Sequence, residues 1–281
     1  MPLSRRRLLL ASIGGAAAPH LSRAQETAGL ELGLLPNLSA RVLLTQYEPM
    51  VSYLGRELRQ RVSASTAVNW ATFHKRTVNL EYDLVVTAAN LARLAQVEAG
   101  WVPVLRYKPD IKGLLACLSS RPLADVQSLR GRTLVLSNPQ SLVALRGLEW
   151  LATQGLHPGR EFTATSVPTD DSVGNVLVRG DAAAAMLSGG EFRAIPEALR
   201  SQLQVMSTFA EVTGFVLMAS PRLPAARRQQ VVDHLVRFAA GSDDGRQFFE
   251  RTGFNAFQAV EPGVMDALQP YVEATRRVLA P

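Results

Sequence analysis

The first strand-like segment of the chain is Leu30-Glu31-Leu32-Gly33-Leu34-Leu35-Pro36-Asn37. It is a short apolar run that closes on Pro-Asn, and such a run predicts a buried strand that ends in a turn. Residues 40–60 follow with apolar side chains at helical spacing, and Pro49 is an internal irregularity. The chain therefore opens with a strand–helix unit.

Strand and helix patterns alternate along the rest of the chain. Strands are predicted at 62–68, 83–88, 102–107, 113–119, 132–136, 162–167, 182–187, 203–209 and 214–219. Helices are predicted at 71–79, 91–99, 123–129, 141–154, 170–179, 192–199, 224–240, 244–252 and 264–279, the last interrupted at Pro270. This alternation favours an α/β fold whose parallel or mixed sheets are covered by helices on both faces.

Two such α/β units lie in tandem, and the elements after residue 212 are too few for a third domain. We expect these late elements to complete the first unit, so that strands cross between two lobes and form a hinge. The expected first lobe is residues 25–117 with 212–281, and the expected second lobe is residues 118–211.

The N-terminal segment, residues 1–24, accounts for most of the positive charge. The whole chain has 30 basic and 24 acidic residues, a net charge of +6. Arg5, Arg6, Arg7 and Arg23 contribute four of these charges and the segment has no acidic residue, so the rest of the chain carries only +2. A charge this small does not favour a nucleic-acid partner.

The same segment resembles a twin-arginine export signal. It reads Ser4-Arg5-Arg6-Arg7-Leu8-Leu9, then an apolar run to Ala18, then Ser22-Arg23-Ala24, which has small residues where signal peptidase cleaves. The apolar run is 11 residues long, whereas a membrane-spanning helix needs about 20. No cysteine lies near the cleavage site to carry a lipid. We expect a mature chain that starts at Gln25 and is released into the periplasm without a stable membrane anchor.

Neither an enzyme nor a metal centre is expected. The four histidines are scattered, and the chain contains no Gly-x-Ser-x-Gly elbow, no His-Glu-x-x-His and no P-loop. Cys117 is the only cysteine, which excludes an internal disulfide and a cysteine-based zinc site. No cofactor is implied.

Several segments together resemble the periplasmic substrate-binding proteins of phosphonate, phosphite and phosphate ABC importers. They are Gly33-Leu34-Leu35-Pro36, Glu48-Pro49-Met50-Val51-Ser52-Tyr53-Leu54, Tyr82-Asp83-Leu84, Ser128-Leu129-Arg130-Gly131-Arg132, Asn138-Pro139-Gln140-Ser141, the segment 155–162, and Val176-Leu177-Val178-Arg179-Gly180-Asp181. The resemblance implies the type 2 periplasmic-binding-protein fold, a monomer that closes on a small ligand between its lobes, and delivery to an ABC permease. The alternative is a sensory module of the same fold that docks on the periplasmic domain of a histidine kinase.

In such a fold the ligand sits at the carboxyl ends of the strands, near the N-termini of helices. The candidate ligand-binding residues in these loops are Asn37, Ser39, Arg41, Trp70, Thr87, Asn90, Gln140, Ser141, Asp170, Asp171 and Glu191. Arg41 is the candidate partner of an anion, and Asp170 and Asp171 are candidates for a cationic group. Each also has a structural reading: Trp70 as a core aromatic, and Thr87, Asn90, Ser141 and the two aspartates as helix caps.

The binding motif departs from the family pattern. Ser141-Leu142-Val143 stands where the family usually has Ser-Thr-Ser, and Asp170 stands where it has a ligand-facing histidine. These changes predict weak binding of phosphate or phosphonate and favour an oxyanion that carries an amino group. Some relatives resemble arsenite sensors that bind through a thiol, which makes Cys117 a candidate thiol ligand.

Overall fold

A computed structural model describes residues 29–167 and 172–280. The predicted export signal and two of the candidate site residues, Asp170 and Asp171, therefore lie outside the described residues.

The first sheet is mixed and has six strands in the order β11-β4-β10-β3-β1-β2. Its strands are β1 (Leu30–Leu34), β2 (Val62–Ser65), β3 (Leu84–Ala88), β4 (Val102–Lys108), β10 (Phe215–Ala219) and β11 (Ala256–Ala259). β1 runs parallel to its neighbours β2 and β3, while β10 is antiparallel to both β3 and β4. The late strands β10 and β11 thus return to the sheet that β1 begins.

Helices cover both faces of this sheet. On one face lie α1 (Ala40–Leu58), α8 (Ala225–Gly241) and α9 (Asp243–Thr252), whose side chains share a core with Leu32 and Leu34. On the other lie α2 (Trp70–Val78), α3 (Ala89–Ala99), α10 (Pro262–Asp266), the short turn η2 (Gln269–Tyr271) and α11 (Val272–Leu279). Burial on both faces explains why β3, all of whose residues are buried, reads as a nearly continuous apolar run.

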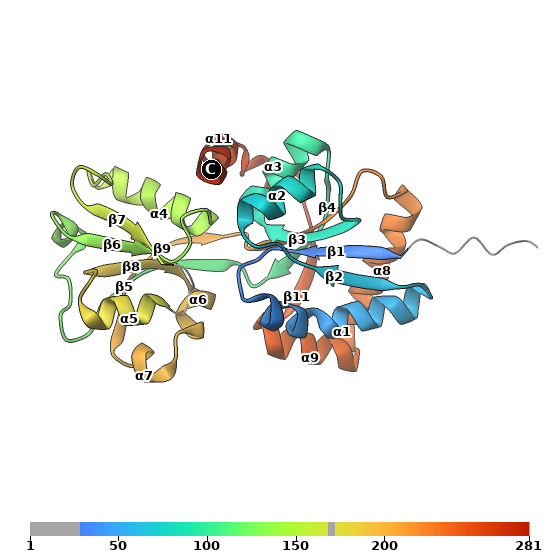
Figure 1. Cartoon of the computed structure of the whole chain (residues 1–281), viewed down its shortest axis with the longest axis horizontal. Helices are drawn as coiled ribbons and strands as arrows, with labels where there is room; N and C mark the ends of the chain where they lie inside the picture. The colour runs from blue at the N-terminus through green and yellow to red at the C-terminus, as the bar shows by residue number, and fades with distance from the viewer. Residues whose placement is uncertain (1–28, 168–171, 281) are drawn as a thin grey trace, which may run out of the picture.

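The second sheet has five strands in the order β7-β6-β8-β5-β9. Its strands are β5 (Ile111–Leu118), β6 (Thr133–Leu136), β7 (Thr163–Ser166), β8 (Ala184–Ser188) and β9 (Leu203–Val212). The turn η1 (Val126–Leu129) and α4 (Leu142–Thr153) lie on one face, and α5 (Ser172–Arg179), α6 (Gly189–Ala194) and α7 (Glu197–Arg200) lie on the other. Two mixed sheets flanked by helices confirm the predicted α/β class, and Figure 1 shows them side by side.

The chain crosses between the sheets at Pro109–Asp110 and again at Thr213–Gly214. A Cβ at Gly214 would lie 2.5 Å from Cδ1 of Ile111, so the Ile111 side chain would have to move to admit it. All of β5 belongs to the second sheet, so the expected boundary at residue 117 falls near the end of that strand. The division of the chain into lobes at residues 117 and 212 stays a prediction. We call the parts built on the two sheets the first and the second lobe.

Two predicted helices are shorter than the sequence indicated. The expected helix at 192–199 consists of two short helices, α6 and α7, because Pro196 lacks the N–H that a continuous helix needs. The expected helix at 123–129 is only the turn η1, which Asp125 caps by accepting from the N–H of Ser128 at 3.0 Å. Among the described helices, none is long and apolar enough to span a membrane.

Candidate ligand-binding cleft

The carboxyl ends of β1 and β3 form a topological switch point in the first lobe, and we call this place the first crevice. These neighbouring strands are parallel, and the N–H of Leu35 extends their pairing by donating to the carbonyl of Val86 at 3.0 Å. The helices that follow them, α1 and α3, go to opposite faces of the sheet. Ligands in α/β sheets bind at such a switch point, because the two loops diverge there and leave a space between them.

The second lobe has the matching crevice between β6 and β8. These strands are also parallel neighbours, and α4 and α6 leave them toward opposite faces. Both crevices lie beside the crossing segments: Ser188 at the end of β8 pairs with Gly113, and the N–H of Ala89 donates to the carbonyl of Gly214 at 2.9 Å. The carboxyl ends of these strands therefore lie on the side of each sheet that faces the other lobe (Figure 1).

Each helix that starts at the second crevice has a capping side chain. The Ser141 hydroxyl accepts from the N–H of Ala144 at 3.1 Å and donates to the carbonyl of Asn138 at 2.8 Å. The Ser188 hydroxyl accepts from the N–H of Glu191 at 3.1 Å, and the Glu191 carboxylate accepts from the N–H of Ser188 in return. Ser141 thus acts as a helix cap in this structure, as its structural reading predicted, and Glu191 belongs to a capping box that the sequence analysis did not predict.

The first crevice differs, because the two helices that start there lack a capping side chain. Ser39 is at the N-cap of α1 and its hydroxyl makes no cap hydrogen bond, while the N-cap of α3 is Ala88. Arg41, in the first turn of α1, is exposed and has no ion pair or hydrogen bond within residues 29–167 and 172–280. A helix N-terminus with free N–H groups and a positive dipole end favours an anion.

Buried hydroxyl groups without partners mark the ends of β3 and β6. The Oγ1 atom of Thr87 and the Oγ atom of Ser137 are inaccessible and have no hydrogen-bond partner in the described part of the chain. Unpaired buried polar atoms are rare in folded proteins. Sequence reasoning did not select Ser137, although its place directly after the apolar strand 133–136 is the same signal that selected Thr87.

Asn90 and Gln140 meet at the junction of the lobes. The Nδ2 atom of Asn90 donates to the carbonyl of Gln140 at 3.0 Å and to Oγ1 of Thr275 at 3.1 Å, and Nε2 of Gln140 donates to the carbonyl of Val278 at 3.1 Å. Both amide side chains therefore donate hydrogen bonds to groups of the protein itself in this structure. Trp70 is buried in the core of the first lobe, as its structural reading predicted, whereas Asn37 is half-buried in the β1–α1 loop.

Cys117 lies away from both crevices. Its side chain is completely buried in β5, where it pairs with Ala184 at the start of β8, and Nε2 of Gln204 is 3.6 Å from its Sγ atom. Four strand residues, about 13 Å, separate it from Gly113 beside the junction. Within the described ranges no group of three or more His, Cys, Asp or Glu residues is arranged to hold a metal ion.

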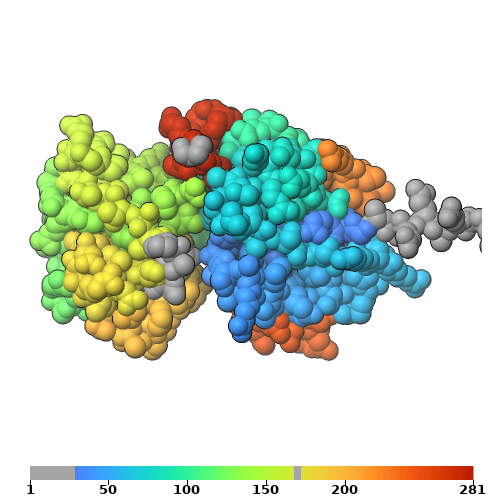
Figure 2. All heavy atoms as spheres, viewed as in Figure 1, coloured from blue at the N-terminus to red at the C-terminus, as the bar shows by residue number. Residues whose placement is uncertain are grey.

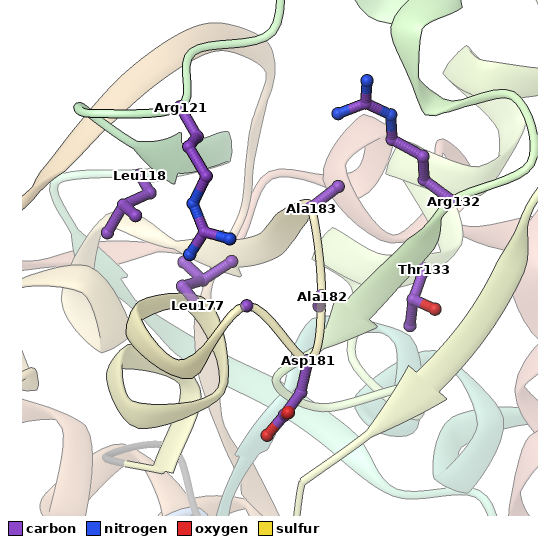
Figure 3. A pocket seen from close by; sticks show the side chains of 9 residues that line it. Leu118, Arg121, Arg132, Thr133, Leu177, Asp181, Ala182 and Ala183 are labelled. Atoms are coloured by element: carbon purple, nitrogen blue, oxygen red, sulfur yellow. The ribbon is translucent and has the colours of Figure 1, made fainter.

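A surface pocket of about 240 Å³ lies at the opposite end of the second sheet. It is lined by the end of β5, the start of β6 and the loop before β8, with Arg121 and Arg132 on its two sides (Figure 3). Arg121 donates to the carbonyl of Val178 at 3.4 Å, and Asp181 pairs with Arg179 at 2.7 Å. This pocket does not open toward the junction of the lobes.

Two helix-flanked mixed sheets with a switch point on either side of a shared junction are the architecture of a type 2 periplasmic binding protein. A family model described as "ABC transporter, phosphonate, periplasmic substrate-binding protein" matches residues 32–263. The chain therefore belongs to this family of periplasmic substrate-binding proteins, whose role is to serve an ABC transporter.

Solved structures share this fold at low sequence identity. PhnD1 from Prochlorococcus marinus in complex with methylphosphonate has a TM-score of 0.78 at 13% identity, over 89% of this chain and 98% of that one. XAC2383 from Xanthomonas citri bound to ATP has a TM-score of 0.73 at 19% identity, over 90% and 98%. A histidine kinase sensor domain has a TM-score of 0.59 at 12% identity, over 82% and 98%. A search of curated proteins found no match.

Proposed function

We propose that this periplasmic binding protein captures a small oxyanion, or an oxyanion that carries an amino group, between its lobes and delivers it unchanged to an ABC permease. The observation that carries the ligand class is the difference between the two crevices. The helices of the second crevice are capped by Ser141 and by the Ser188–Glu191 pair, whereas α1 in the first crevice starts without a cap hydrogen bond.

We therefore assign the anionic group of the ligand to the first crevice. Asn37, Ser39 and Arg41 surround the start of α1, and Thr87 lies at the end of the adjacent strand. Arg41 supplies the full positive charge that this group needs, and the Ser39 hydroxyl and the free N–H groups supply hydrogen bonds. The amino group is assigned from the sequence alone to Asp170 and Asp171.

A thermal-shift screen of the mature protein tests this proposal. The compounds are phosphonates, phosphite, sulfonates, amino-containing oxyanions and arsenite. A compound at 100 times its dissociation constant adds about 2.7 kcal/mol to the free energy of unfolding. We expect an amino-containing oxyanion to stabilise the protein, and the shift to disappear in Arg41→Gln.

The matched control is Arg132→Gln, which changes an exposed arginine at the far end of the second lobe. The control keeps the full shift if Arg41 holds the anion. A full shift in Arg41→Gln, or strong stabilisation of the native protein by plain phosphate, contradicts the assignment. Asp170→Asn tests in the same way whether Asp170 binds the amino group of the ligand.

Export and partner are part of the proposal. We propose that residues 1–24 direct export by the twin-arginine route and are then removed, and that the mature chain is a monomer. N-terminal sequencing of the periplasmic form is expected to start at Gln25.

A neighbouring permease and ATPase gene pair supports transport, whereas a neighbouring kinase and response regulator supports the sensory alternative.

A further inference from the structure

The C-terminal segment, residues 269–279, lies across both lobes. We call this segment, which comprises η2 and α11, the C-terminal clasp. In Figure 1 it lies between α3 and α4, and in Figure 2 it lies at the top of the line where the lobes meet. Neither strand pairing nor the crossing segments require a helix in this place.

The clasp is anchored on α3 of the first lobe. Oγ1 of Thr275, a completely buried residue, accepts from Asn90, and Nε of Arg276 donates to the Glu98 carboxylate at 2.9 Å. Arg93 on the same helix donates to the side chain of Gln269 at 2.9 Å.

From this anchor the clasp binds α4 of the second lobe. The Tyr271 hydroxyl donates to the Glu149 carboxylate at 2.8 Å and accepts from the Arg146 guanidinium, which lies 5.7 Å from the centre of the Tyr271 ring. At the other end of the clasp, the carbonyl of Val278 accepts from the Gln140 side chain. Polar contacts thus join the clasp to α4 and to the loop before it.

An apolar contact joins the lobes at the same place. Leu142 and Val143, the first two residues of α4, are 5% and 6% exposed and belong to the hydrophobic cluster of the first lobe, together with Val272 and Leu279 of the clasp. The rest of α4 packs on its own sheet, with Leu151 in the core of the second lobe. Separating the lobes would expose these apolar side chains to water, which is unfavourable.

Leu142 and Val143 occupy the two positions where the resembled family has hydroxyl residues. We propose that here they act with the C-terminal clasp to hold the second lobe against the first in the ligand-free protein. Contacts that are lost when the lobes separate favour the arrangement in which the lobes touch. The direct hydrogen bond from Asn90 to Gln140 belongs to the same set of contacts.

The test is the distance between the lobes, measured without any ligand. Spin labels are attached to Lys75→Cys on α2 and Ala198→Cys on α7, two exposed positions on different lobes. Native Cys117 is completely buried and does not compete for the label. Pulsed electron resonance then gives the distribution of label distances.

Two clasp variants remove different contacts. Tyr271→Phe with Gln140→Ala removes the side-chain hydrogen bonds from the clasp to the second lobe, while Asn90 still donates to the backbone carbonyl of Gln140. Leu142→Ser with Val143→Ser removes the apolar contact. The control, Tyr53→Phe with Gln229→Ala, makes the same chemical changes as the first variant on α1 and α8, away from the junction. Circular dichroism establishes that each labelled protein is folded.

We expect one short distance in the native protein and in the control, and a longer distance as the main population in at least one clasp variant. The proposal is overturned if the native protein has the same long distance as its main population. It is also overturned if both clasp variants are folded and keep the native distribution. Because no ligand is present, this result is independent of the ligand screen described above.

Discussion

Gly33 shows how one residue of the opening strand determines packing. It lies in β1 beneath the ring of Tyr82, and a Cβ atom there would lie 2.7 Å from two ring carbons. Tyr82 is buried and stacks on Phe73 with ring centres 5.6 Å apart, so its ring has no room to move. The glycine in the Gly-Leu-Leu-Pro segment therefore has a packing role.

We predict that Gly33→Ala lowers the free energy of unfolding by about 1–3 kcal/mol, the usual cost of overpacking a core. Urea denaturation followed by circular dichroism measures it. Gly263→Ala is the control, because nothing lies within 4 Å of a Cβ at that position. Equal stabilities of the two variants would show that Tyr82 adjusts freely.

Glu98 makes the anchor of the clasp sensitive to acid. Burial raises its pKa, but hydrogen bonds from His74 at 2.8 Å and from Arg276 at 2.9 Å outweigh this effect, so the pKa of Glu98 lies below its ordinary value. A carboxyl with a lowered pKa in the folded state contributes stability above the ordinary value, about 4.3, and loses it as the pH falls through the lower folded value.

We predict that the difference in unfolding free energy between the native protein and Glu98→Gln is present at neutral pH and shrinks as the pH falls below about 4.3. Urea unfolding at a series of pH values measures this difference. A difference that stays constant into the acid range would mean that Glu98 has the same pKa folded and unfolded.

Among the elements, α4 allows the capping role of Ser141 to be tested separately from ligand binding. The Ser141 hydroxyl makes two local hydrogen bonds, to Ala144 and to Asn138. We predict that Ser141→Ala lowers the free energy of unfolding by about 1 kcal/mol and that Ser141→Asp, which keeps a good cap, does not. Chemical denaturation of the three proteins tests it. If Ser141→Ala is as stable as the native protein, the hydroxyl is not acting as a cap.

Sequence patterns predicted elements well where burial dominates and less well where local chemistry does. β1, β3 and α3 follow from apolar runs and helical spacing, because each is buried against its sheet. β11 was not predicted: its four residues, Ala-Phe-Gln-Ala, form a strand only because the edge of β4 is available for pairing. The use of Asn90 and Gln140 between lobes also depends on tertiary contacts and has no signal in the sequence.

The candidate site, too, could be predicted from the sequence only in part. Loops after strands could be located from the order of elements, and the crevices lie there. Which helix N-terminus is free could not be predicted, because Ser39 and Ser141 are both serines placed before a helix and only Ser141 turns its hydroxyl back to the helix. That choice depends on the conformation of each loop.

At the scale of the whole molecule, the lobes are tied by a shared hydrophobic cluster. Leu142 and Val143 come from the second lobe, and Val272 and Leu279 come from the clasp on the first. Lobes that share buried apolar surface lose it together, so they unfold as one cooperative unit. Without this contact, the lobes are joined by the crossing segments and by polar contacts such as the one between Tyr271 and Glu149, and they share less buried apolar surface.

We predict that the native protein unfolds in one transition in urea and that Leu142→Ser with Val143→Ser separates the lobes into two. Far-UV circular dichroism follows the helices of both lobes, and pulse labelling of Cys117, completely buried in the second sheet, reports the second lobe alone. In the native protein the thiol should become reactive at the urea concentration at which the helices are lost. In the variant it should react at a lower concentration, because the second lobe no longer gains stability from the first.

Val205→Ser, a change of an exposed side chain in β9, controls for the loss of an apolar residue and should keep the transitions coincident. Thiol labelling that precedes the loss of helices in the native protein itself would show that the lobes unfold independently.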